Sequence, residues 1–275
     1  MPELPEVETM VRDLRPRVVG RSIVGVEAQF PGIVVYPDFP ELVERVADRE
    51  ITAIDRRGKY AIFELSSDEI LVIHRGMTGS LLHRAVDAPQ DPYVRIAFFL
   101  DDGSSLRLRD PRKFGKVLLM DRVGAERPLP WVRMGPEPLD GDFTPAGFSR
   151  ALKNRTALIK PLLLNQQIVA GLGNIYVDEA LFLARIHPER RANTLKPAET
   201  KRLHAAIQQV LASAVEGRGT TFSSYADIDG RAGEFQDSLQ VFRRAGAECP
   251  RCGSPIERRV VGGRGTHVCP RCQRA

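Results

Sequence analysis

The chain has 275 residues, of which 43% are hydrophobic and 27% are charged, and these globular proportions exclude a disordered or fibrous protein. At about 100–200 residues per domain, the length predicts roughly two domains whose cores need no disulfide bonds. The net charge is +5, no apolar run reaches the ~18 residues of a membrane span, and the acidic start MPELPEVETM is unlike a signal peptide, so we expect a cytoplasmic protein with no membrane association.

Charge is unevenly distributed along the chain. Residues 1–150 carry 21 Lys and Arg against 24 Asp and Glu, whereas residues 151–275 carry 19 against 11, a net charge of +8. A basic C-terminal half indicates a polyanionic partner, most simply a nucleic acid. On charge alone, a solvated basic surface with no partner is an equally good explanation.

The first half of the chain is predicted to be rich in strands. A helix is expected from about Pro5 to Val18, because apolar residues at positions 7, 10, 11 and 14 form one stripe. Alternation and short apolar runs then predict strands at 23–28, 51–56, 61–65, 70–73, 95–100, 105–109 and 116–120, with one helix at 39–47. That many strands in about 100 residues indicates a sandwich or barrel.

The second half is predicted to be helical. Residues 124–143 are rich in Pro and Gly and are expected to be a linker, and the helical pattern follows at about 145–153, 156–164, 175–185 and 197–215. Residues 216–238 are rich in Gly, Ser and Asp and are expected to form a flexible loop.

All four cysteines lie in the last 27 residues, as Cys249-Pro-Arg-Cys252 and Cys269-Pro-Arg-Cys272. Two such knuckles with a 16-residue spacer have the spacing of a four-cysteine zinc site. Disulfides are not expected in a cytoplasmic chain, and a redox pair of the thioredoxin type would need a βαβ pattern that is absent. We therefore predict one structural zinc ion with no position open for catalysis, holding an Arg-rich hairpin that suits phosphate.

The N-terminus offers a second kind of chemistry. Removal of Met1 would expose the secondary amine of Pro2, which can attack a carbon electrophile and form an iminium ion. The neighbouring Glu3 and Glu6 could donate a proton or hold the amine in place. On the pattern alone a simpler explanation stands beside this one, because many proteins begin with Met-Pro and acidic residues commonly start helices.

Four motifs in chain order together resemble the bacterial formamidopyrimidine-DNA glycosylases. They are MPELPEVET at the start, Asp110-Pro-Arg-Lys-Phe-Gly115, Ala170-Gly-Leu-Gly-Asn-Ile-Tyr176, and the cysteine-rich end. The resemblance covers the whole chain, and Leu4 favours this branch over the endonuclease VIII branch, whose members usually have Gly there.

With this resemblance the expected fold class is α+β. We expect an N-terminal helix and β-sandwich domain at 1–123, a linker at 124–143, a helical domain with a helix–two-turn–helix motif at 144–240, and a zinc β-hairpin at 241–275.

The resemblance implies a bifunctional DNA glycosylase and AP lyase of base excision repair. Such an enzyme removes 8-oxoguanine and formamidopyrimidines from damaged double-stranded DNA, here as a nucleoid-associated bacterial monomer. By the same resemblance Pro2 is the nucleophile that attacks C1′ and forms a Schiff base, and Glu3 is the proton donor that assists sugar opening. Lys59 is implied to transfer a proton in β-elimination, and Arg264 to bind phosphate and serve δ-elimination.

The resemblance also implies DNA contacts. A duplex hides C1′, so the enzyme must extrude the nucleotide, and Met77, Arg112 and Phe114 match the residues that fill the void left behind. Without the resemblance, Met77 and Phe114 would be assigned to the core and Arg112 to an ordinary surface. Asn174, in the turn of the helix–two-turn–helix motif, and Arg155 match positions that contact the DNA backbone.

Some positions depart from the family pattern. Tyr93 stands where many relatives have a DNA-contacting His, and a tyrosine can still donate to phosphate. In the segment 221–227, Ser223 and Asp227 replace an Arg and an Asn, and Asn165 replaces an Asp. Because this segment covers flipped 8-oxoguanine in the family, the same chemistry on oxidised pyrimidines, as in endonuclease VIII, stays open as an alternative. A non-catalytic zinc protein that binds damaged DNA is a separate alternative, against which Pro2, Glu3 and Lys59 argue.

Overall fold

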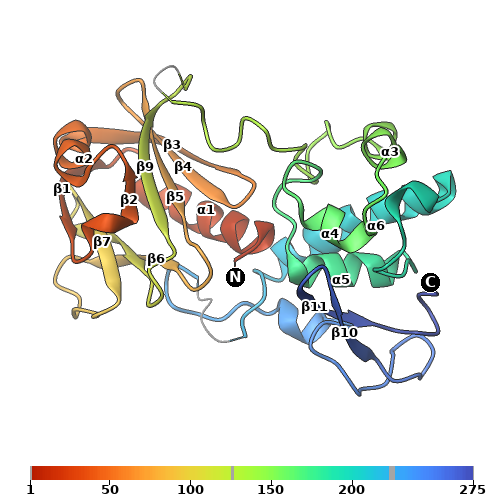
Figure 1. Ribbon diagram of the computed structural model, residues 1–275. Coiled ribbons are helices and arrows are strands. Elements are labelled where there is room, and N and C mark those ends of the chain that lie inside the picture. Colours follow the sequence, from red (N-terminus) through yellow and green to blue (C-terminus); the bar gives the residue numbers. More distant parts are fainter. Residues whose placement is uncertain (1, 125–126, 223–226, 275) are drawn as a thin grey trace. The chain divides into compact units, whose positions relative to one another are not determined.

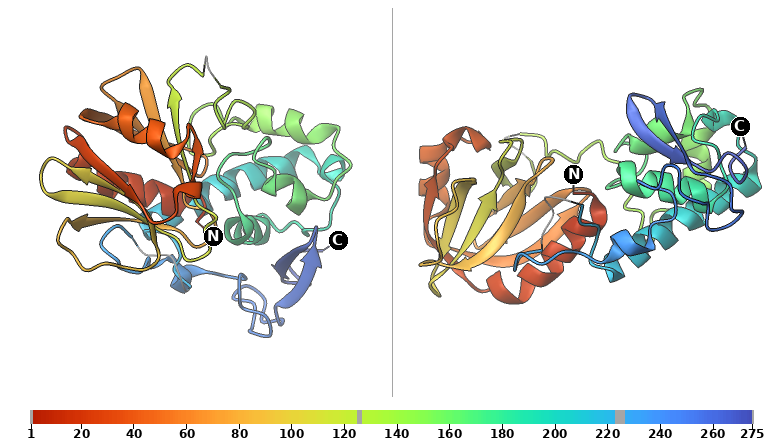
Figure 2. Two further views of the ribbon diagram at one scale, coloured as in Figure 1. Left: turned by 60° about the vertical axis from the view of Figure 1, so that its left-hand side comes forward. Right: turned by 90° about the horizontal axis from the view of Figure 1, so that it is seen from below.

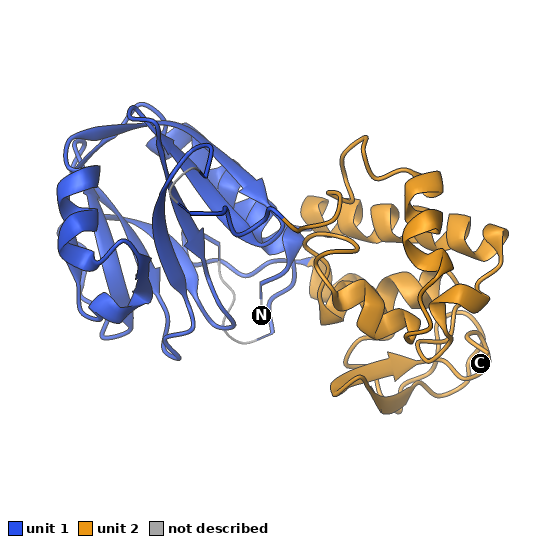
Figure 3. Ribbon diagram, turned by 45° about the horizontal axis from the view of Figure 1, so that its top comes forward, with its two compact units in different colours: residues 1–132, 217–234 blue, residues 133–216, 235–275 orange. Residues whose placement is uncertain are grey.

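The computed structural model describes residues 2–124, 127–222 and 227–274, and these pack into two compact units (Figure 3). Unit 1 comprises residues 1–132 and 217–234, and unit 2 comprises residues 133–216 and 235–275. The packing thus places the segment 217–234 with the N-terminal elements, and the cysteine hairpin with the helices. The mixed α+β class expected from the sequence is confirmed.

Unit 1 combines strands with two helices, α1 (Leu4–Val18) and α2 (Phe39–Val46), and a short 3₁₀ turn, η1 (Pro31–Ile33). In the described part of the chain its strands are β1 (Ser22–Ala28), β2 (Val34–Tyr36), β3 (Arg49–Arg57), β4 (Tyr60–Leu65), β5 (Glu69–His74), β6 (Ser80–Ala85), β7 (Val94–Leu100), β8 (Ser104–Arg109) and β9 (Lys116–Asp121). All seven strands predicted by alternation are present. The sequence pattern missed β2, which is three residues long, and β6, whose burial does not alternate.

The strands form one hydrogen-bonded ladder in the order β2-β9-β5-β4-β3-β1-β7-β8-β6 (Figure 1). Pairing between β3 and β1 covers only Ser22–Glu50 and Ile23–Arg49. This short pairing allows the sheet to bend between β3 and β1, so that its two halves can face each other. One apolar core takes buried residues from both halves of the ladder and from α1. The two halves therefore form the predicted sandwich.

Helix α1 is fixed by its buried stripe and by its first turn. Val7, Met10, Val11 and Leu14 are each at most 1% exposed, and burial of such a side chain stabilises the fold by about 1.5–3 kcal/mol. The helix packs against β3 and β4 (Figure 2). Its first turn therefore holds residues 2–6 on a rigid sheet.

Unit 2 contains α3 (Pro145–Lys153), α4 (Ile159–Leu164), α5 (Asn174–Leu183), α6 (Pro197–Glu216), the 3₁₀ turns η2 (Ala192–Thr194) and η3 (Phe235–Ser238), and the hairpin β10 (Glu257–Val261) and β11 (Arg264–Val268). The four predicted helices are present. Helix α4 begins three residues later than predicted because Leu158 is extended and forms a β-bridge with Arg191. Among the described residues, no helix has the length and apolar character needed to cross a membrane.

Candidate active site

The first turn of α1 is organised by the Glu6 carboxylate. Glu6 Oε2 accepts from the backbone N–H of Glu3 at 2.7 Å, and Oε1 accepts from the backbone N–H of Thr220 at 2.9 Å. Pro2 is buried, and Glu3 and Glu6 are each 1% exposed. Glu6 thus has a positioning role, because its two oxygens join residue 3 to the segment 217–222.

Gly219 makes this contact possible. Its φ is +78°, and a Cβ at this position would lie 2.9 Å from Glu6 Cγ and Oε1. Such a conformation is favourable for glycine and costly for other residues. The close approach of backbone to carboxylate therefore requires glycine at 219.

Lys59 lies in the turn between β3 and β4, next to Gly58, whose φ is +55°. Arg56 Nε donates to Glu8 Oε2 of α1 at 2.9 Å, and the Arg56 guanidinium also donates to the Gly58 carbonyl at 3.1 Å. Burial raises the pKa of Glu8, but hydrogen bonds from Arg56 and Arg12 outweigh it and hold that pKa below its ordinary value. The Lys59 turn is therefore attached, through an ionised pair, to the helix that begins beside Pro2 and Glu3.

Asp110 shapes the loop that follows β8. This fully buried carboxylate accepts from Thr78 Oγ1 at 2.7 Å and from the backbone N–H groups of Arg112 at 3.2 Å, Phe114 at 2.7 Å and Gly115 at 2.7 Å. Hydrogen bonds to a charged group contribute about 1.5–3 kcal/mol each. One side chain therefore sets the conformation of residues 110–115 and ties that loop to the turn at 76–79.

The loop and the turn together present three side chains to solvent. Met77 is 37% exposed and Phe114 is 48% exposed, so neither is a core residue. The Arg112 Cζ lies 4.7 Å from the centre of the Phe114 ring. Gly76 has φ +63°, and a Cβ there would lie 2.6 Å from the Phe114 carbonyl carbon and oxygen, so the two backbones are in close contact. The structure thus brings the three predicted void-filling residues onto adjacent, well-fixed loops.

Tyr93 is exposed among cationic groups. Its ring centre lies 5.0 Å from Arg109 Cζ and 5.7 Å from Arg95 Cζ. Its backbone N–H donates to Asp91 Oδ1 at 2.8 Å, and Arg109 Nε donates to Asp91 Oδ2 at 2.6 Å. Burial raises the pKa of Asp91, but these hydrogen bonds lower it below its ordinary value. The backbone at Tyr93 is thereby held by an ionised carboxylate, while its ring stays accessible to a ligand.

Unit 2 carries the remaining predicted DNA contacts. Arg155 is exposed just after α3, and Arg264 is exposed at the start of β11. Asn174, the first residue of α5, donates from Nδ2 to the Gly265 carbonyl at 2.9 Å. One amide hydrogen of Asn174 is thus already engaged by the hairpin, so this residue connects α5 to the strand that bears Arg264.

The four cysteines have the geometry of a zinc site. Their sulfurs lie within 4.8 Å of one another, with Cys252 and Cys269 Sγ 3.5 Å apart and Cys249 and Cys272 Sγ 4.0 Å apart. A tetrahedron with Zn–S bonds of about 2.3 Å has S–S edges of about 3.8 Å, which falls between these values. No disulfide joins the cysteines. They bind one structural zinc ion, as the sequence predicts, and all four ligands are supplied by protein.

For two residues the sequence leaves the role open: Asp110 is part of a family motif with no role of its own, and Glu6 is predicted either to donate a proton or to hold the amine in place. Asp110 opens the Asp110-Pro dipeptide, and Asx-Pro pairs favour the start of a turn, which was the available signal. For Glu6 no local signal distinguishes positioning from catalysis, because its partner Thr220 is distant in sequence.

His74 is expected to make the stability of unit 1 depend on pH. Burial first, and then the charges of Lys59, Lys116 and Arg75, lower the pKa of His74 to about 4, while its Nδ1 accepts from the Gly76 N–H at 3.1 Å. Between about pH 6.5 and 4 the unfolded chain binds the proton and the native chain does not, so stability falls as pH falls through this window. At 1.36 kcal/mol per unit, the loss is at most about 3 kcal/mol.

The measurement is the free energy of unfolding at several pH values for the wild type and His74→Asn. Asparagine keeps an acceptor for Gly76 but does not titrate. The variant should therefore show a shallower fall in stability between pH 6.5 and 4, whatever its constant offset. Parallel curves would contradict a neutral His74.

Three family models match the chain in order. The formamidopyrimidine-DNA glycosylase N-terminal domain matches residues 1–117, the formamidopyrimidine-DNA glycosylase H2TH domain matches residues 134–225, and the zinc finger found in FPG and IleRS matches residues 246–275. The matched regions together contain the candidate site and the cysteine cluster.

Relatives and solved structures agree with these models. The chain is 50% identical to a formamidopyrimidine-DNA glycosylase of Symbiobacterium thermophilum, over 99% of this chain and 89% of that protein. It is 46% identical to one of Heliobacterium modesticaldum over the full length of both.

Its structure is similar to that of Lactococcus lactis Fpg in complex with DNA containing N7-benzyl-Fapy-dG, with a TM-score of 0.93 and 40% identity over both full chains. It is also similar to MutM (Fpg) of Thermus thermophilus, with a TM-score of 0.89 and 44% identity over 99% of this chain and 98% of that one. The chain belongs to the formamidopyrimidine-DNA glycosylase family of DNA-repair enzymes.

Proposed function

We propose that this protein is a bifunctional DNA glycosylase and AP lyase that removes oxidised purines from duplex DNA through a Schiff base on Pro2. The observation that carries the proposal is the buried Pro2–Glu3 start, which Glu6 fixes at the head of α1. A nucleophilic amine needs a fixed position and a nearby proton donor, and this arrangement supplies both in a chain of the glycosylase family.

The first chemical step exchanges one bond at C1′ for another. The Pro2 nitrogen forms a bond to C1′ as the glycosidic bond breaks, and the base leaves with its electron pair and takes up the proton that the amine releases. Glu3 then protonates the sugar ring oxygen, the ring opens, and an iminium ion remains. The amine must be unprotonated when it attacks, and a positioned acid of this kind contributes about 10²–10⁴-fold.

Strand cleavage follows from the iminium ion. Loss of a C2′ proton expels the 3′ phosphate by β-elimination, and we assign this proton transfer to Lys59, in the turn attached to α1 by the Arg56–Glu8 pair. Loss of a C4′ proton then expels the 5′ phosphate by δ-elimination. The exposed Arg264 is assigned to binding the phosphate at this stage. The expected product is a one-nucleotide gap.

Extrusion of the damaged nucleotide needs a replacement in the helix. Met77 and Phe114 are exposed apolar side chains on the loops fixed by Asp110, and Arg112 can hydrogen-bond the orphaned base. Unstacking costs a few kcal/mol per step, which the contacts of bent DNA offset. Rigid loops favour this role because little conformational entropy is then lost on binding.

The proposed partner is damaged double-stranded DNA, bound by a monomer in the bacterial cytoplasm at the nucleoid. The relatives named above are bacterial, and a solved structure similar to this chain is that of Lactococcus lactis Fpg with DNA containing an abasic site, at 39% identity and a TM-score of 0.93. The net charge of +8 on residues 151–275 suits a phosphate backbone. Tyr93, Asn174 and Arg155 are proposed backbone contacts.

The DNA affinity is expected to fall steeply with salt. Each phosphate contact contributes a slope of about −0.9 in log K against log salt. Arg155, Arg264 and Lys59, which by the family resemblance is also proposed to contact phosphate, should together give a slope at least as steep as about −2.7. Replacing Arg155 with Gln should reduce the steepness by about 1. Fluorescence anisotropy with an abasic-site duplex at several salt concentrations measures both slopes.

Lys201→Gln is the matched control, because Lys201 is exposed on α6 and lies outside the proposed contacts. Its slope should equal that of the wild type. Equal slopes for Arg155→Gln and the wild type would remove Arg155 from the interface.

A second candidate function keeps the chemistry and changes the lesion. A similar solved structure is that of Lactococcus lactis Fpg with DNA containing an oxidised pyrimidine, at 39% identity and a TM-score of 0.92. Residues 223–226, which belong to the segment that departs from the family pattern, lie outside the described residues. The lesion preference is therefore a question for experiment.

Matched duplexes containing 8-oxoguanine opposite cytosine or thymine glycol opposite adenine decide between the two. We expect single-turnover excision of 8-oxoguanine to be faster by at least about tenfold, which corresponds to about 1.4 kcal/mol. A preference for thymine glycol would establish the pyrimidine function. Binding without cleavage of either duplex, by zinc-loaded protein whose intact mass shows that Met1 is removed, would favour the non-catalytic alternative.

A further inference from the structure

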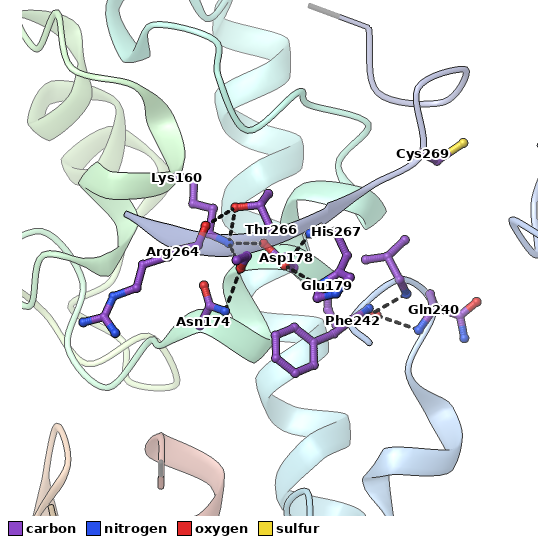
Figure 4. A network of polar contacts seen from close by, with 12 residues as sticks. Lys160, Asn174, Asp178, Glu179, Gln240, Phe242, Arg264, Thr266, His267 and Cys269 are labelled. Carbon is purple, nitrogen blue, oxygen red and sulfur yellow. Dashed lines mark hydrogen bonds and ion pairs between the residues drawn. The ribbon is translucent and has the colours of Figure 1, made fainter. Parts of the chain in front are cut away.

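A fully buried ion pair lies between the helices of unit 2 and the zinc hairpin (Figure 4). Lys160 of α4 donates from Nζ to Asp178 Oδ1 of α5 at 2.6 Å, and both side chains are 0% exposed. The same ammonium donates to Thr266 Oγ1 at 2.8 Å and to the Gly265 carbonyl at 3.1 Å, both on β11. One cation therefore joins two helices to the strand that begins with Arg264.

The second carboxylate oxygen of Asp178 extends this connection. Asp178 Oδ2 accepts from the His267 backbone N–H at 2.9 Å and lies 3.3 Å from His267 Nδ1. Thr266 Oγ1 in turn donates to the Arg264 carbonyl at 3.0 Å, and Asn174 Nδ2 donates to the Gly265 carbonyl. Three residues of β11, Arg264, Gly265 and His267, thus have a backbone group bound by this cluster, and Thr266 is bound through its hydroxyl.

The cluster occupies the edge of β11 that β10 leaves unpaired. Strand β10 pairs along the other edge, from Glu257–Val268 to Val261–Arg264. Figure 4 shows the Arg264 side chain extending away from the buried groups, with Cys269 at the far end of the strand. The strand is therefore fixed by zinc at its Cys269 end and by the ion pair at its Arg264 end.

Stability alone does not explain such a pair. Burying two charges costs several kcal/mol per ion, and a well-packed apolar replacement is often neutral or stabilising. What an apolar pair cannot supply is a set of directed bonds to the backbone of β11. Glu179, adjacent to Asp178, binds the backbone N–H groups of Gln240, Val241 and Phe242, so α5 also holds the start of the hairpin region without metal.

We propose that Lys160 and Asp178 are positioning residues for Arg264, which set the register of β11 on the helices independently of zinc. The inference rests on the proposed phosphate role of Arg264. Misplacing a catalytic group by about 1 Å can cost about 10²-fold in rate. Loss of the pair should therefore impair δ-elimination while the Schiff base at Pro2, which belongs to the other unit, still forms.

The test uses the zinc-loaded full-length enzyme and a duplex with an abasic site. Lys160→Met combined with Asp178→Asn removes both charges together, leaves an acceptor for the His267 N–H, and avoids a buried unpaired charge. Arg264→Ala is the reference and Lys201→Met, on the exposed face of α6, is the control. The readouts are zinc per chain, the rate of borohydride trapping, and the ratio of δ- to β-elimination products.

We expect the double variant to keep one zinc and its trapping rate but to lower the product ratio about tenfold, toward the value for Arg264→Ala. Thr266→Val removes the hydroxyl that connects Lys160 to the Arg264 carbonyl and should act in the same direction, whereas Thr266→Ser keeps that hydroxyl and should restore the ratio. This second pair decides the matter if the double variant does not fold, because both changes preserve the ion pair.

Three outcomes would overturn the inference. The first is an unchanged product ratio in the Lys160 and Thr266 variants although Arg264→Ala lowers it, which would leave the proposed function intact. The second is zinc loss in parallel with the ratio, and the third is an equal fall of trapping and both products, since either shows general destabilisation. If Arg264→Ala itself leaves the ratio unchanged, the phosphate role of Arg264 fails instead, and the inference with it.

Discussion

Replacing Pro2 with Gly is expected to lower strand cleavage at an abasic site by about 10² or more, because a weaker nucleophile slows the step on which the others depend. Glycine leaves a primary amine at the same place, which is a weaker nucleophile. DNA affinity should stay within about twofold, since the proposed phosphate contacts lie elsewhere. Single-turnover cleavage and anisotropy binding on the same duplex measure the two effects.

Pro31→Gly is the matched control for this change. Pro31 is an exposed proline of unit 1 in η1, outside the site, and its replacement should leave cleavage unaltered. If Pro2→Gly cleaves as fast as the wild type, or if the control loses activity to the same extent, the nucleophilic assignment of Pro2 is wrong.

Replacing Cys269 with Ser is expected to abolish zinc binding and to weaken DNA binding by at least about tenfold. Cys269 is fully buried and belongs to an apolar cluster with Phe182, Val241, Cys249 and Ile256, so loss of the metal should loosen the hairpin that bears Arg264. Structural zinc contributes about 10–16 kcal/mol of apparent binding free energy in small domains. Zinc per chain by atomic absorption and the Kd for an abasic-site duplex provide the readouts.

Val260→Ser changes a side chain on the same hairpin that is 66% exposed and binds no metal. It should keep one zinc and the wild-type Kd. Cys269→Ser protein that retains zinc at one per chain, or that binds DNA as tightly as the control, would show that the cluster does not support the DNA-binding surface.

Much of the fold follows from local sequence patterns. The stripe of α1 and the alternating strands depend on neighbouring residues, so periodicity is sufficient to find them. Strand β2 was not predicted because three residues are too few to show a period. It is a strand because it pairs with β9, which is distant in sequence. The start of α4 was misplaced because Leu158 pairs with Arg191, a contact that local helix patterns do not contain.

The residues of the site differ in the same way: some are indicated by neighbouring sequence, and others depend on contacts with residues distant in the chain. Pro2 and Glu3 are indicated by the Met-Pro start of the chain, and the four cysteines by their own spacing. Lys160 and Asp178 are 18 residues apart in the sequence, and the strand that they bind lies about 90 residues after Asp178. Periodicity therefore gives no sign of this pair. One signal was present: the Asp178-Glu179 pair interrupts the otherwise apolar sequence of α5, and charges buried on such a helix must have partners.

The central claim is that the N-terminal amine of Pro2 carries the chemistry, and the most direct measurement is the site of covalent attachment. The protein, with Met1 removed, is incubated with an 8-oxoguanine duplex and borohydride, and the trapped complex is digested and mapped by mass spectrometry. Our account predicts a sugar remnant on the Pro2 nitrogen. Attachment to a lysine such as Lys59, or turnover of the lesion with no trapped complex, would contradict it.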